Sequence, residues 1–243
     1  MNNNNRSTRK AFLLIPIAWL YLSGTASAQE SAYADLDACV KQEQLTSTAK
    51  GAAVGALVGL AGGLLSGNNK NAGKGALIGA AVGGTAGFAT AYYSANQTCQ
   101  EKNPAWIPES RIERTKNYAQ AKKANKYKPS EGIVAKVEKV EMKSSVKAGA
   151  GVEIRSSFVV LTPDGAETTA LIERKLFVVR DGKPNLVPFP GKSHEERTLE
   201  PGEHSDHVTL PTNSDMQGTE LQFDFSVTAG GKTSTASANV KLM

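Results

Sequence analysis

Four side chains that could bind a metal or transfer a proton lie close together in the chain: Glu203, His204, Asp206 and His207. Carboxylates and imidazoles are transition-metal ligands, and histidine titrates near neutral pH. Their spacing argues against a shared centre, because alternate residues of a strand share one face, so His204 and Asp206 point away from His207. We expect a solvated strand edge after the turn at residues 199–203, with no metal site and no cofactor.

Motifs for nucleophilic catalysis or phosphate binding are not visible in the sequence. No serine occupies a nucleophile-elbow sequence, and no glycine-rich loop follows a predicted strand. The acids Asp164, Asp181 and Glu195 lie in predicted turns. We therefore predict that the protein is not an enzyme and has no catalytic residues.

Residues 1–28 have the three parts of a secretory signal peptide. Basic residues precede a short apolar run at residues 11–22, and residues 26–28 (Ala-Ser-Ala) supply small residues for cleavage. The run is shorter than the roughly 20 residues that span a bilayer, although an uncleaved N-terminal anchor is the alternative. No cysteine follows residue 28 directly, so we expect export without covalent lipid.

Export also decides how the two cysteines, Cys39 and Cys99, are interpreted. An oxidising compartment lets such a pair persist as a disulfide. They flank the segment 50–93, and an antiparallel hairpin there would bring them together. Closing a loop of about 60 residues is worth roughly 4 kcal/mol in the chain-entropy description. Unpaired or intermolecular thiols are the alternative. A metal site is not expected, because no histidine lies near either cysteine.

The segment 50–93 carries glycine at every fourth position in two arms separated by a polar turn. Four residues exceed one helical turn by roughly 40°, so each arm would have a winding groove without side chains. Backbones approach closely along such grooves in membrane helices. The glycines expected to pack helices are Gly51, Gly55, Gly59, Gly63, Gly67, Gly75, Gly79, Gly83 and Gly87.

The solvent decides whether these arms are helical. Each interior glycine costs roughly 1 kcal/mol relative to alanine in water, whereas lipid forces the backbone to bond internally. Residues 51–69 and 75–100 carry no charge, so we expect the arms to insert in or assemble at a membrane, with Tyr92 and Tyr93 at its interface. A soluble helical hairpin and a flexible linker are the alternatives, and two lysines in the turn are the main objection to full insertion.

Residues 50–93 resemble the glycine-zipper envelope proteins of Gram-negative bacteria, the group typified by the rickettsial surface antigen-like two-helix domain. The resemblance rests on the repeated Gly-x-x-x-Gly arms. It implies an envelope-associated hairpin that oligomerises or inserts in a membrane, and it implies no catalytic residues.

A basic stretch follows the second cysteine. Residues 109–128 contain seven Lys and Arg against two Glu, a local net charge of +5, and we expect a helical spacer that favours anionic lipid headgroups or other envelope polyanions. A solvated spacer helix is the alternative. Nucleic acid is not expected, because export removes the chain from the cytoplasm and no recognition module is visible. The residues expected to bind an anionic surface are Arg111, Arg114, Lys116, Lys122, Lys123 and Lys126.

From residue 132 apolar and polar residues alternate in runs separated by turn signals, which is typical of β-strands. Leu221, Phe223, Phe225 and Val227 show the alternation most clearly. About seven strands fit an immunoglobulin-like β-sandwich, and a small open barrel is the alternative. The expected strands span residues 133–142, 151–161, 169–180, 186–189, 205–210, 220–228 and 234–242.

These patterns predict an α+β protein of two parts, a glycine-rich helical hairpin followed by an all-β immunoglobulin-like sandwich. The expected boundaries are residues 1–28 for the signal peptide, 29–103 for the hairpin with flanking helices, 104–131 for the basic helical spacer and 132–243 for the sandwich. The hairpin is expected to bind membrane lipid and to form a homo-oligomer.

The predicted function is that of a non-catalytic cell-envelope protein in the periplasm, attached to the outer membrane in preference to the inner. Its sandwich would bind an envelope protein or polymer. One alternative is a soluble periplasmic accessory protein whose hairpin packs on the helices of a partner. The other is a pore formed by zipper oligomers.

Overall fold

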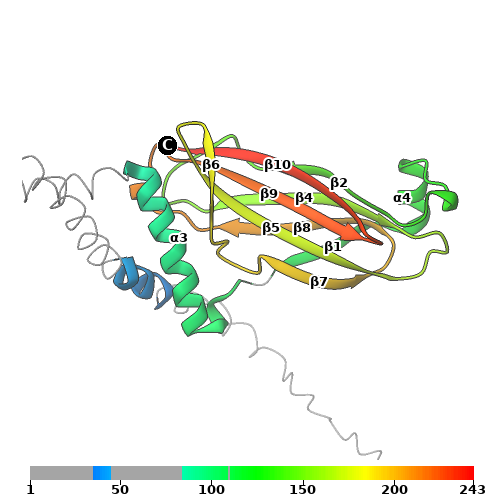
Figure 1. Cartoon of the computed structure of the whole chain (residues 1–243), viewed down its shortest axis with the longest axis horizontal. Coiled ribbons are helices and arrows are strands. Elements are labelled where there is room, and N and C mark those ends of the chain that lie inside the picture. Colours follow the sequence, from blue (N-terminus) through cyan, green and yellow to red (C-terminus); the bar gives the residue numbers. More distant parts are fainter. Residues whose placement is uncertain (1–34, 45–83, 109) are drawn as a thin grey trace, which may run out of the picture.

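The structure is a computed structural model that describes residues 35–44, 84–108 and 110–243 (Figure 1). Residues 35–44 are helical. The other helices are α3 (Gly84–Lys102), α4 (Tyr118–Ala124), and the 3-10 turns η2 (Pro104–Trp106), η3 (Pro129–Glu131) and η4 (Ser214–Met216). The strands are β1 (Arg111–Lys116), β2 (Val134–Glu141), β3 (Ser145–Val146), β4 (Val152–Leu161), β5 (Thr168–Arg180), β6 (Lys183–Val187), β7 (His194–Leu199), β8 (Gly202–Leu210), β9 (Glu220–Ala229) and β10 (Lys232–Leu242).

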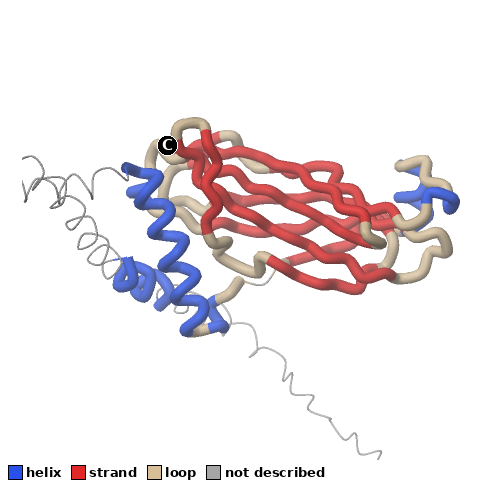
Figure 2. The backbone as a smooth tube through the Cα atoms, in the orientation of Figure 1, coloured by secondary structure: helices blue, strands red, loops and turns tan. Residues whose placement is uncertain are grey.

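The strands form two sheets that lie face to face, as Figure 2 shows. Sheet A has the order β1-β8-β4-β2, and sheet B has the order β3-β10-β9-β5-β6, with β7 pairing with the other half of β5. All these pairings are antiparallel except that of β3 with β10. The predicted α+β class with a C-terminal β-sandwich is confirmed.

Alternation along the strands fills the space between the sheets. On β9 the apolar residues Leu221, Phe223, Phe225 and Val227 are all fully buried, as predicted. The turn from β9 to β10 has positive φ at Gly230 (55°) and Gly231 (73°), a conformation that two-residue hairpins need and that glycine adopts without strain.

The segment predicted as a basic helical spacer, residues 104–131, does not form one helix, and this prediction is wrong. Residues 111–116 are instead edge strand β1, which pairs with β8 from Arg111 opposite His207. Helix α4 is a separate short element, started by a capping box in which the side chains of Asn117 and Gln120 each accept a hydrogen bond from the other's backbone N–H. Pairing with a neighbour overrode the helical propensity of a charged sequence.

The two helical parts lie at opposite ends of the sandwich (Figure 1). Helix α3 and the helical segment 35–44 cover the end where β5 passes into β6, and α4 packs at the other end beside β4 and β8. The predicted strands other than 186–189 match β2, β4, β5, β8, β9 and β10 closely, and β6 replaces the weak strand at 186–189. Strands β1, β3 and β7 were not predicted.

Candidate functional site

A disulfide between Cys39 and Cys99 clamps the helical segment 35–44 to α3, which confirms the predicted bridge. The Cα atoms of the two cysteines are 6.1 Å apart. A salt bridge from Lys102 to Glu43 joins the same two helices. The two ends of the glycine-rich segment are therefore covalently closed on each other, and we call residues 35–44 with α3 the clamped helix pair.

Helix α3 is anchored on the sandwich by an aromatic pair. The side chain of Tyr93 is fully buried, and its hydroxyl donates a hydrogen bond of 3.1 Å to the carbonyl oxygen of Pro211. Burial raises the pKa of Tyr93 well above its usual range, and burial together with the charge of Asp37 raises the pKa of Tyr92 to about 12. The expectation that these tyrosines lie at a membrane interface is wrong, because packing against the domain buries both rings.

The acidic and histidine residues of β8 are buried, which corrects the prediction of a solvated strand edge. Strand β8 lies between β1 and β4, and Asp206 and His204 are 1% and 3% exposed. The two share one face of the strand, as predicted, and this face points into the core, while His207 lies on the outer face and is 3.0 Å from the hydroxyl of Ser205. The His204 ring stacks on Phe158 at 5.3 Å.

A buried ionic cluster links the two sheets around Arg174 of β5. Its guanidinium donates two hydrogen bonds to the carboxylate of Asp206 and lies 3.3 Å from that of Glu195. Glu195 was predicted in a turn but lies on β7, where it also accepts hydrogen bonds from Ser110 and from Arg197. With every partner charged or hydrogen-bonded, the cluster is a structural link between the sheets.

Burial and pairing change the titration of two of these buried groups in different ways. Burial works to raise the pKa of Glu195, but the hydrogen bonds from Ser110 and Arg197 and the charge of Arg174 outweigh it and lower that pKa. Burial lowers the pKa of His204 below its usual value. Within the described ranges, no three His, Cys, Asp or Glu side chains are arranged to hold a metal ion.

The six basic residues predicted to bind an anionic surface fall into two groups. On β1, Arg114 is paired with Glu200 and Lys116 lies 2.6 Å from Glu203, while Arg111 is exposed and weakly paired at 4.0 Å. Lys122, Lys123 and Lys126 belong to α4 and the residues after it, with the Lys122 ammonium 5.6 Å from the ring of Tyr118. The structure does not gather these six side chains in one place, because Arg111 lines a pocket beside the clamped helix pair while α4 lies at the far end of the sandwich (Figure 1).

The zipper glycines from Gly51 to Gly83 lie outside the described residues. Gly87 belongs to α3, and a Cβ atom placed there would meet nothing within 4 Å, so this position does not pack closely against the rest of the described chain. None of the helices that the structure describes is both long enough and apolar enough to span a bilayer.

A groove of about 1470 Å³ separates the clamped helix pair from the outer face of sheet A. Tyr92, Asn96 and Gln100 of α3 line one wall, and Trp106 lies beside them. The sequence did not predict the groove, which arises where a helix crosses the end of a sheet.

The fold and site define a class of protein: a β-sandwich with a disulfide-clamped helix pair that closes a glycine-rich segment. Comparison with protein families narrows this class for the N-terminal part, because residues 7–95 match the family described as YMGG-like Gly-zipper. The predicted glycine-zipper resemblance is thus confirmed. Among curated proteins, none matches the chain.

Three solved structures that resemble part of the chain each cover less than half of it. A CARDB domain from Pyrococcus furiosus, solved with di-metal ions, has 13% identity, covers 46% of this chain and 97% of that one, and gives a TM-score of 0.31. A conjugative transposon lipoprotein from Bacteroides eggerthii has 16% identity, covers 44% of this chain and 95% of that one, and gives 0.27. A β-glucosidase from Listeria innocua has 13% identity, covers 45% of this chain and 16% of that one, and gives 0.31. Because identity and TM-scores are this low, we assign the fold of the domain from its own strand order.

Proposed function

We propose that the protein is a non-catalytic component of the bacterial cell envelope. In this proposal the glycine-zipper hairpin inserts in or oligomerises at a membrane, the outer membrane in preference to the inner. The clamped helix pair then holds the β-sandwich at the periplasmic surface, where the sandwich binds a partner. The family match over residues 7–95 supports the envelope assignment.

The observation that carries this proposal is the disulfide between Cys39 and Cys99 together with the packing of α3 on the sandwich through Tyr93. A hairpin closed at its base and docked on a folded domain transmits its position to that domain. A flexible linker would need neither the covalent closure nor the buried Tyr93 contact. Disulfides persist in oxidising compartments, so the bridge supports a periplasmic position for the base of the hairpin.

Fractionation of cells that produce the native protein tests the proposal. We expect the protein in the membrane fraction, resistant to high salt and released by detergent, because apolar insertion is not screened by ions as surface charge is. Recovery in the soluble periplasmic fraction without detergent would contradict membrane insertion. The matched control is the Cys39→Ser/Cys99→Ser variant, which keeps the glycine arms and loses only the clamp.

A soluble accessory protein is the second candidate, and the open space at Gly87 favours it specifically. The face of α3 at Gly87 is free of close contacts within the described chain, so a helix of a partner could approach its backbone there. Soluble recovery combined with partner-dependent protection of α3 from proteolysis would support this candidate. A pore would require release of dye from liposomes by the purified protein.

A further inference from the structure

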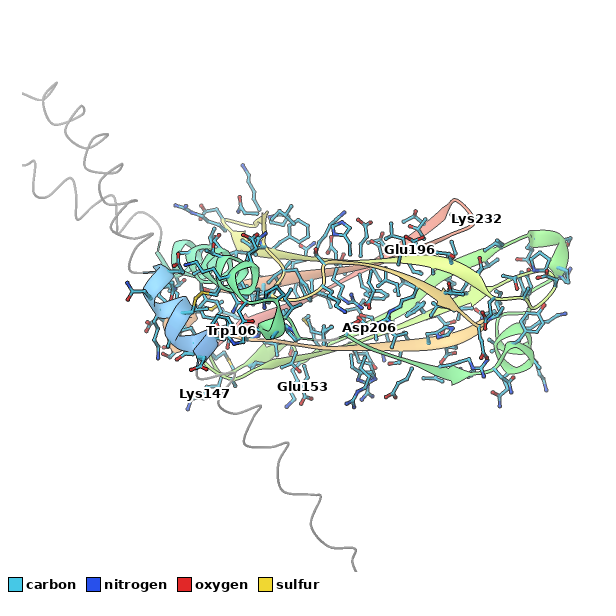
Figure 3. All side chains as sticks on the ribbon, turned by 90° about the horizontal axis from the view of Figure 1, so that it is seen from below. Trp106, Lys147, Glu153, Glu196, Asp206 and Lys232 are labelled. Carbon is cyan, nitrogen blue, oxygen red and sulfur yellow. A yellow bond between two sulfur atoms is a disulfide. The ribbon has the colours of Figure 1, made fainter. Side chains whose placement is uncertain are left out.

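The groove beside the clamped helix pair has a floor of charged and polar side chains in register. Strand pairing places Glu141 opposite Arg155, Arg155 opposite His207, and His207 opposite Arg111. These four residues form one row across the outer face of sheet A, and all of them line the groove. Figure 3 shows Glu153, the neighbour of this row on β4, projecting from the same face. The floor therefore offers planar donors and acceptors at strand spacing.

The wall of the groove contains a buried acceptor without a partner. Asn96 is 1% exposed and lines the groove, and its side-chain oxygen has no hydrogen-bond partner among the described residues. This oxygen is shielded from solvent, and leaving it unpaired costs about 1–3 kcal/mol, so a rotation of the amide that brings it to a hydroxyl or amide donor of a ligand would be stabilised. Trp106, partly exposed on its 3-10 turn, adds a large flat apolar surface beside it.

Two lysines mark the rim of the groove at the other side. Lys143 and Lys147 flank the short strand β3, and both line the groove. Neither forms an ion pair within the described part of the chain. Figure 3 shows Lys147 on the sheet A side of the clamped end. A ligand with acidic substituents would find cations here, whereas the floor also carries the carboxylates of Glu141 and Glu153.

From this lining we infer that the groove binds a saccharide chain that carries acidic substituents. An aromatic face, an unpartnered carboxamide and a row of planar polar groups suit the alternating apolar faces and hydroxyls of a sugar ring. The carboxylates of Asp37, Glu113, Glu141 and Glu153 in the lining disfavour a regular polyanion such as nucleic acid. The inference rests on the proposed display of the sandwich in the cell envelope and names the class of its partner.

Trp106 provides the measurement, because the chain contains two tryptophans and the other, Trp19, lies in the predicted signal peptide. Full-length protein carrying Trp19→Phe, purified in detergent, is titrated with three probes. They are a muropeptide (the disaccharide of N-acetylglucosamine and N-acetylmuramic acid with its acidic stem peptide), neutral chitotetraose, and the stem peptide alone. We expect a blue shift of the Trp106 emission with both saccharides, and binding of the muropeptide about tenfold tighter than that of chitotetraose.

Matched variants separate the groove from general surface effects. Lys143→Glu/Lys147→Glu should reduce the preference for the muropeptide to about twofold or less, and Asn96→Leu should weaken both saccharides about tenfold. The controls are Lys232→Glu and Glu196→Gln on the sheet B side (Figure 3), which should change neither affinity. Binding to Trp106→Leu is measured by calorimetry, because this variant lacks the fluorescent side chain. The variant should bind both saccharides more weakly, and the comparison requires that its melting temperature match that of the parent.

Three results would overturn the inference. The first is no change in Trp106 emission with either saccharide at millimolar concentration. The second is binding of the stem peptide alone as tight as that of the muropeptide. The third is an equal loss of affinity in the groove variants and the control variants. The titration uses purified protein and does not depend on membrane insertion. If the saccharides do not bind but the protein fractionates with membranes, the saccharide site is excluded and the proposed function is retained. If the saccharides bind but the protein is recovered in the soluble fraction, the saccharide site is retained and membrane insertion is excluded.

Discussion

Arg174 and Asp206 join the two sheets of the sandwich through two hydrogen bonds of 2.8 Å each, and both side chains are fully withdrawn from solvent. Arg174 comes from sheet B and Asp206 from sheet A, so the pair crosses the core. In that environment each charge depends on the other, because a lone buried charge has lost its water without gaining a partner. The cluster extends through Glu195 to Ser110, which directly precedes β1.

Removing one partner of this pair should be strongly destabilising. Asp206→Asn leaves the Arg174 charge without its main counter-ion, and we expect a loss of about 3–5 kcal/mol in the free energy of unfolding, measured by urea denaturation of the oxidised protein. Arg174→Met/Asp206→Leu should recover much of this loss because it buries no charge. Glu153→Gln on the exposed face is the control, with a change below about 0.5 kcal/mol. A mild effect of Asp206→Asn would show that the pair is not needed.

Loss of the disulfide should loosen the clamped helix pair more than the sandwich. Cys39→Ser/Cys99→Ser removes a closed loop worth roughly 4 kcal/mol in the chain-entropy description, and it leaves residues 35–44 held by the buried side chains of Leu36 and Val40 and by the ion pair of Glu43 with Lys102. We expect faster amide hydrogen exchange in residues 35–44, with exchange in β9 nearly unchanged. Uniform acceleration across the domain would instead show that the clamp stabilises the whole fold.

Glycine is required at position 202, where β8 begins. A Cβ atom there would lie 2.3 Å from the carbonyl oxygen of Lys116, and backbone cannot move aside as a side chain can. Gly202→Ala should therefore cost about 1–3 kcal/mol and increase hydrogen exchange in β1. Gly151→Ala is the matched comparison, since its Cβ would crowd a side-chain methyl group, that of Thr209 at 2.8 Å, and would meet the backbone oxygen of Leu210 only at an ordinary 3.8 Å. Equal costs for the two variants would contradict this explanation.

His204 should make the stability of the domain depend on pH in a defined direction. Its pKa in the folded state is lowered by burial below the ordinary value of 6.5, so the unfolded chain binds a proton that the folded chain resists. Stability should then be complete above about pH 6.5 and decrease as pH falls through the unfolded pKa. His204→Gln should make the melting temperature depend less on pH between pH 7 and pH 5, and an unchanged pH dependence in this variant would contradict the assignment.

The zipper predicts that bulky residues in the glycine rows weaken helix association. Gly59→Leu or Gly83→Leu would fill the groove and reduce cross-linked oligomers in membranes, because close backbone contact is lost. Gly87→Leu is a useful comparison, since its Cβ direction is open and the domain should keep its melting temperature. Unchanged cross-linking in Gly59→Leu and Gly83→Leu would count against the zipper.

The sequence was most informative where the physical signal is local. Alternation at Leu221, Phe223, Phe225 and Val227 predicted β9, because side-chain direction along a strand depends on a few neighbouring residues. The disulfide was predictable because two cysteines flank one hairpin-like segment. Strand β1 was missed since its residues are charged, and its conformation comes from pairing with β8.

By itself the sequence determined the order of the parts: a glycine-repeat segment closed by Cys39 and Cys99, followed by a β-sandwich. Only the tertiary structure decided that Asp206 and His204 are buried, that Tyr93 packs on the domain, and that α4 lies far from α3. The physical reason is that burial and charge pairing depend on residues distant in the chain. Arg174 is 32 positions from Asp206, and no local pattern records that they meet.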